Sequence, residues 1–132
     1  MRSAGFSLIE LIVVITIIGI LATAVVMNLQ GRDEDAKVAK VKADFTTCGS
    51  AIDMFKLDHG RFPDSLEELL NPPDTGNGKK YIKNMPTDPW TNEPYQIETS
   101  DDGSPILISY GADMAEGGEG YNQDLYSNDM GQ

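Results

Sequence analysis

An acidic, glycine-rich block near the C-terminus, residues 110–125, carries the side chains best suited to chemistry; it reads YGADMAEGGEGYNQDL. Calcium takes about six to eight oxygens from carboxylates, amides and backbone carbonyls, and clustered glycines let carbonyls turn inward. With few apolar residues, the block alone is expected to be disordered, so a bound cation could order it. Its spacing does not match an EF-hand loop, and a solvated acidic loop is the alternative.

A second candidate is Glu10, the one charged residue within the apolar residues 6–27. A carboxylate in hydrocarbon costs at least a few kcal/mol unless it is paired, neutralised or near the interface. One interpretation is an interfacial glutamate favoured by the dipole at the start of a helix. The other is a carboxylate that a partner pairs or neutralises.

Catalytic residue patterns are absent from the sequence, so it predicts no enzyme. His59 is the only histidine, and no Ser/His/Asp, Cys/His or zinc-ligand spacing accompanies it. Cys48 is the only cysteine, so no intramolecular disulfide can form. Its place among apolar residues predicts a core position.

The charge is unevenly distributed along the 132 residues, whose formal net charge is −11. The last basic residue is Lys83, and ten Asp or Glu follow it. Nucleic acid is therefore excluded as an expected partner, because phosphate binding needs a basic face.

The N-terminal apolar run, residues 6–27, is about the length that a helix needs to cross the hydrocarbon of a bilayer. The flank before it is too short for the basic region of an ordinary secretory signal peptide, so the run is expected to be retained. Arg2 predicts that this end stays cytoplasmic, which places the acidic bulk of the chain on the other side of the membrane.

A long helix must position both candidates, because no proline occurs before Pro63 and an apolar stripe continues beyond the membrane run. We expect one helix over about residues 6–59, which would be about 80 Å long. The stripe alternates spacings of three and four residues and consists of Val38, Val41, Phe45, Cys48, Ile52 and Phe55.

Beyond that helix, the pattern predicts a small head of α+β class. Gly60 should end the helix, and residues 65–70 should form a short helix with a capping box between Ser65 and Glu68. Strands are expected over about residues 95–98 and 106–109, joined by a turn with an Asp-Gly dipeptide. The resulting antiparallel sheet would cover the apolar stripe.

The run from Gly5 through Phe6, Ser7, Leu8 and Ile9 to Glu10 resembles the prepilin-peptidase motif of type IV pilins and pseudopilins. The resemblance implies a type IV pilin-like fold, cleavage between Gly5 and Phe6, and methylation of the new Phe6 amine. It also implies that Glu10 pairs with the Phe6 amine of a neighbouring subunit. The expected organisation is a prepilin leader over residues 1–5, a transmembrane and filament-core helix over 6–27, and a periplasmic head over 28–132.

Three further segments resemble the major pseudopilins of type II secretion systems: residues 57–63 (LDHGRFP), 86–95 (PTDPWTNEPY) and the acidic block. In the family, a turn and a glycine-rich stretch like the acidic block form a calcium site. The resemblance implies structural calcium, held by the carboxylates of Asp113 and Asp124, the carbonyls of Tyr110 and Ala115, and Gln123.

The resemblance implies a structural subunit of the type II secretion pseudopilus, polymerising into a filament that drives export of folded proteins across the outer membrane. Its expected location is the inner membrane, with a single span, and after assembly the periplasm. Its expected partners are copies of itself, minor pseudopilins, prepilin peptidase, the inner-membrane assembly platform and membrane lipid.

Two alternatives remain at this stage. One is a type IV pilin of a surface pilus for adhesion, motility or DNA uptake, although such pilins usually close the C-terminal region with a disulfide that the single Cys48 cannot supply. The other is a monomeric binding module on an ordinary anchor, in which Glu10 would be incidental.

Overall fold

The computed structural model describes residues 5–73 and 78–131, without the side chains of residues 27–30 and 130–131. The first four residues of the predicted leader thus lie outside the described residues. The chain divides into two compact units, residues 1–35 and 36–132. The long helix α1, Leu8–His59, begins in the first unit and ends in the second.

Helix α1 begins two residues later than expected. A capping box between Ser7 and Glu10 forms at this end of the helix. The Ser7 amide donates to Glu10 Oε2 at 3.2 Å, and the Glu10 amide donates to Ser7 Oγ at 3.3 Å. Two N–H groups that have no partner within the helix are satisfied in this way, which fixes where the helix begins.

Within the second unit, the helical stripe predicted from the sequence is confirmed, since Val41, Phe45, Cys48, Ile52 and Phe55 are all buried. Val38 is partly buried and packs against the same core. The helix ends as predicted at Gly60, where φ is 72° and the amide donates to the Lys56 carbonyl at 2.8 Å.

The short helix α2, Leu66–Leu70, follows Ser65 as expected, but the predicted capping box with Glu68 is wrong. Ser65 makes no side-chain cap hydrogen bond. The Glu68 carboxylate instead accepts two hydrogen bonds from Arg61, both at 3.0 Å, and one from the Asp64 amide at 2.9 Å. The bidentate guanidinium and the Asp64 amide together hold the Glu68 carboxylate away from the predicted cap residue, Ser65.

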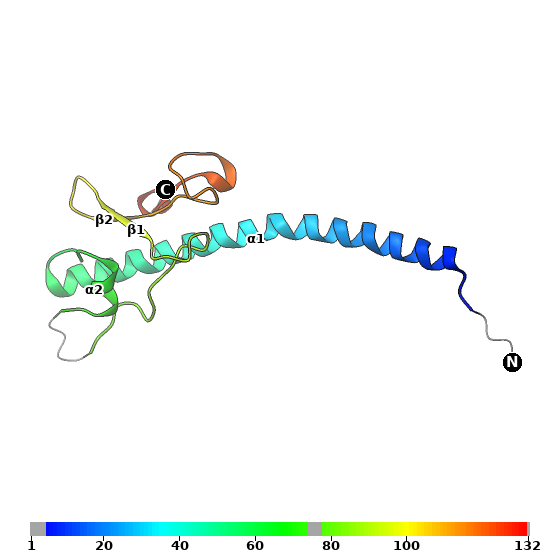
Figure 1. The fold of residues 1–132 in the computed structure, drawn as a ribbon. Helices are drawn as coiled ribbons and strands as arrows, with labels where there is room; N and C mark the ends of the chain where they lie inside the picture. Colours follow the sequence, from blue (N-terminus) through cyan, green and yellow to red (C-terminus); the bar gives the residue numbers. More distant parts are fainter. Residues whose placement is uncertain (1–4, 74–77, 132) are drawn as a thin grey trace. The chain divides into compact units, whose positions relative to one another are not determined.

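The sheet has three antiparallel strands in the order β1-β2-β3: Gln96–Thr99, Pro105–Ser109 and Leu125–Tyr126. The first two match the predicted strands to within one residue, and Gly103 at φ 84° lies in the turn between them. Figure 1 shows both beside the C-terminal part of α1. Strand β3 was not predicted, and it is only two residues long. Two 3₁₀ helices, Gly120–Asn122 and Ser127–Gly131, flank β3.

The core of the head lies between α1 and the elements that follow it, which confirms the α+β class. Residues from α2, β2 and the intervening loops meet the stripe and the neighbouring Ala51 of α1: Leu66, Leu69, Ile82, Trp90, Tyr95 and Leu107. Cys48 lies in this core as predicted, and burial, followed by the nearby Asp44 carboxylate, raises the pKa of its thiol to about 11. The Tyr95 hydroxyl donates to Asp44 at 2.7 Å, which ties the start of β1 to α1.

Candidate functional site

The first unit presents an apolar helix whose large side chains are exposed throughout its described length. Part of α1 is long and apolar enough to cross a membrane. Phe6, two residues before the helix begins, is 91% exposed. So much apolar surface is unstable in water, and it requires lipid or other subunits around it.

Glu10 lies at the start of this helix, on its exposed surface. Its capping bond with Ser7 shows that the carboxylate already has a local structural role. This bond uses Oε2, and the Ser7 hydroxyl accepts the reciprocal bond. Pairing with the Phe6 amine of another subunit stays a prediction.

The acidic block in the second unit is shaped by glycines in the left-handed region. A Cβ on Gly111 would lie 2.6 Å from the Tyr121 carbonyl oxygen and 2.9 Å from that of Gln123. The neighbouring Ala112 amide donates to the Tyr121 carbonyl at 2.8 Å. The two ends of the loop therefore touch through their backbones, which requires glycine at position 111.

Asp124 is the side chain in this loop that best fits a cation. The Gly117 amide donates to its Oδ2 at 2.8 Å, and the Tyr126 hydroxyl lies 3.4 Å from the same atom. Oδ1 is buried and has no hydrogen-bond partner among the described residues. A buried carboxylate oxygen without a donor is costly, and a calcium ion would satisfy it.

The positions of the other predicted ligands point less clearly to a metal ion. Asp113 is exposed, and its Oδ1 accepts the Ala115 amide at 3.2 Å. Gln123 is exposed and Tyr110 is partly buried. In the described ranges no three His, Cys, Asp or Glu residues form a metal-binding group. A calcium ion here would need carbonyls besides its carboxylates, as the predicted ligand set has.

The sequence did not reveal which residues shape the loop through their backbones. Gly117 supplies the amide for Asp124, and a Cβ on Gly118 would meet the Asn122 carbonyl oxygen at 2.6 Å. The clustering of glycines was the available signal, but it did not distinguish which of them face a neighbouring backbone.

Gly111→Ala should destabilise the head more than Gly120→Ala. Both glycines have positive φ, which costs an alanine about 1–2 kcal/mol, but a Cβ on Gly120 meets nothing within 4 Å. The clash with the Tyr121 carbonyl should about double the loss at Gly111. Denaturant unfolding followed by Trp90 fluorescence measures both, and equal losses would contradict the close backbone approach.

An exposed apolar helix with a capped glutamate at its start, and a small three-stranded antiparallel sheet in the second unit, are features of a type IV pilin-like fold. Comparisons with known proteins agree. Residues 1–26 match the model of the prokaryotic N-terminal methylation motif, and residues 28–128 match that of type II secretion system protein G.

Curated relatives cover nearly the whole chain. The type II secretion system core protein G of Vibrio cholerae is 38% identical, over 94% of this chain and 90% of the relative. That of Pseudomonas aeruginosa is 40% identical, over 94% of each. The crystal structure of the major pseudopilin of enterohaemorrhagic Escherichia coli is 28% identical, covers 75% of this chain and 92% of that one, and superposes with a TM-score of 0.56.

The chain belongs to the type II secretion system protein G family. It is a structural subunit of a pseudopilus that works with other components of the secretion system. The family assignment favours this function over that of a surface type IV pilin.

Proposed function

We propose that this chain is held in the inner membrane by residues 6–27 with its head in the periplasm, and that it is extracted from there to lengthen a periplasmic filament. The observation that carries the proposal is the exposed apolar surface of the first unit. In the membrane lipid covers this surface, and in the filament the helices of other copies replace the lipid. Growth at the base would push folded proteins toward an outer-membrane channel.

Processing at Gly5 would create the amine that assembly needs. A prepilin peptidase would cut before Phe6 and methylate its new N-terminus, in keeping with the methylation motif over residues 1–26. The charged amine of one subunit would then pair with Glu10 of a neighbour. This pairing would give a register to helices that are otherwise apolar and could slide past one another.

Calcium is proposed as the structural ion of the head. Asp113 and Asp124 would supply carboxylate oxygens, and the Tyr110 and Ala115 carbonyls with Gln123 would supply the rest. The unpartnered, buried Asp124 Oδ1 supports this assignment. When bound, the ion would hold together a loop that no disulfide closes.

The remaining partners follow from the same role. Minor pseudopilins would begin the filament, and an inner-membrane assembly platform would add the subunits. The function is mechanical and not catalytic, and nucleic acid is not among the partners.

Loss of the gene should trap exported proteins in the periplasm and leave surface fibres intact. Comparing the proteins of the culture supernatant and the periplasm with and without the gene, alongside electron microscopy of the cell surface, tests this. Normal export with lost fibres would contradict the secretion role and indicate a surface pilin.

A further inference from the structure

Among the described residues of the head, the most buried carboxylate belongs to Asp88, whose exposed fraction is 5%. Its Oδ1 accepts the Trp90 amide at 2.9 Å, and its Oδ2 accepts the Ser109 hydroxyl at 2.5 Å. Both donors are neutral, so the desolvation of the carboxylate is offset by hydrogen bonds rather than by an opposite charge. This short, buried hydrogen bond to Ser109 therefore connects the turn over residues 88–93, the Asp88 turn, to the end of β2.

Ser109 is the residue of the sheet that donates this hydrogen bond. It is the last residue of β2, so Tyr110 and the acidic block follow it directly. In the β2–β3 pairing, Ser109 lies opposite Leu125, the residue after Asp124. The Asp88–Ser109 bond thus lies close to two proposed calcium ligands. Tyr110 follows Ser109 in the chain, and Asp124 precedes Leu125, the residue that pairs with Ser109.

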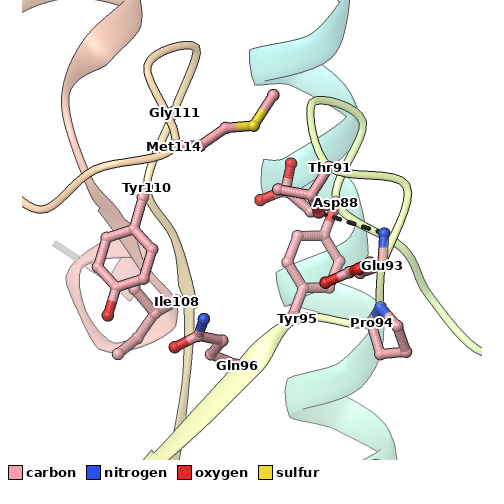
Figure 2. A pocket seen from close by; sticks show the side chains of 10 residues that line it. All are labelled: Asp88, Thr91, Glu93, Pro94, Tyr95, Gln96, Ile108, Tyr110, Gly111 and Met114. Atoms are coloured by element: carbon pink, nitrogen blue, oxygen red, sulfur yellow. Dashed lines mark hydrogen bonds between the residues drawn. The ribbon is translucent and has the colours of Figure 1, made fainter.

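The Asp88 turn also faces the acidic block directly. A small cavity of about 100 Å³ is lined by Asp88 and Glu93 from the turn and by Tyr110, Gly111 and Met114 from the start of the block. Figure 2 shows Asp88 and Glu93 with Tyr95 on one side, and Tyr110 with Ile108 on the other. A shift of the turn would consequently displace residues at the start of the acidic block.

We propose that Asp88 is a positioning residue for the calcium site, acting through Ser109 and without touching the ion. This rests on the proposed calcium function of the loop. The Asp88 carboxylate fixes the end of β2, and β2 in turn fixes the Tyr110 carbonyl and, through β3, Asp124. Residues that orient metal ligands without binding the metal commonly change metal affinity about 10- to 100-fold when replaced.

The test is a calcium titration of the detergent-solubilised full chain by calorimetry at 25 °C, with melting in chelator measured alongside through Trp90 fluorescence. Asp88→Asn and Ser109→Ala should each raise the calcium concentration at half-saturation about tenfold or more. Ser109→Ala removes a single hydroxyl, so it serves as the test if Asp88→Asn does not fold.

A matched control exists at the other end of β2, where Asp102 accepts the Ser104 hydroxyl at 2.6 Å. Asp102→Asn removes the same charge from an exposed Asp–Ser pair on the same hairpin and should leave half-saturation unchanged. Lower melting temperatures in chelator for Asp88→Asn and Ser109→Ala, with calcium half-saturation as in the wild type, would overturn the positioning role and leave the calcium site standing. Absence of calcium binding by the wild type would overturn both.

Discussion

Replacing Glu10 with alanine is expected to abolish filament assembly and export while leaving the subunit folded and in the membrane. Removing one partner of a desolvated ion pair costs about 3–5 kcal/mol, so each contact between subunits should weaken by roughly 100-fold or more. Membrane retention should not fall, because the change removes a charge from an apolar helix. Disulfide or chemical crosslinking of subunits in cells, with export measured in parallel, gives the result.

The capping box supplies the control for this experiment. Glu10 is both a helix cap and the proposed intersubunit partner, and Ser7→Ala removes one of the two capping bonds while keeping the carboxylate. Loss of the cap alone costs about 1 kcal/mol and should leave crosslinked multimers abundant. If Ser7→Ala were as defective as Glu10→Ala, the role of Glu10 would be local capping; if Glu10→Ala assembled normally, the residue would be incidental.

Calcium should raise the melting temperature of the head, and Asp124→Asn should remove most of that increase. A ligand that binds only the folded state stabilises it by about 2.7 kcal/mol at 100 times its dissociation constant. For a unit of this size, such a gain corresponds to roughly 10–20 °C. The full chain in detergent, melted in excess calcium and in chelator with Trp90 as the probe, measures the difference.

Glu119→Gln is the matched control for Asp124→Asn, because it removes the same charge from an exposed position in the same loop. It should keep the calcium-dependent increase. Equal melting temperatures for the wild type in calcium and in chelator would refute the metal site. An unchanged increase in Asp124→Asn would exclude this carboxylate from the ligand set.

The sequence predicted well the parts of the fold that depend on apolar periodicity or on a single residue with a strong conformational preference. The stripe that includes Phe45 and Phe55 repeats at helical spacing over many turns, so its burial followed directly. Gly60 ended α1 because few other residues adopt its positive φ. Strand β3 has only two residues, too few for a periodic pattern of apolar side chains. It forms only because it pairs with β2.

Side-chain competition explains the local error at α2. Ser65 and Glu68 have the spacing of a capping box, but Arg61 lies seven positions before Glu68 and comes near it only after the chain turns. At the acidic block, sequence similarity supplied the candidate ligands. It did not indicate that Oδ1 of Asp124 has no donor among the described residues, or that Asp88, from a different turn, accepts the hydroxyl of Ser109 directly before the block.

The small size of the sheet also bears on the solubility of the head. β1 and β3 are the edges of the described sheet, and they are only four and two residues long. β1 carries the exposed Glu98, and β3 runs directly into a 3₁₀ helix. Such short, charged or interrupted edges are poor templates for adding strands from other chains. We therefore expect strand addition between neighbouring heads to be unfavourable, so that contacts between subunits come from the apolar helix instead.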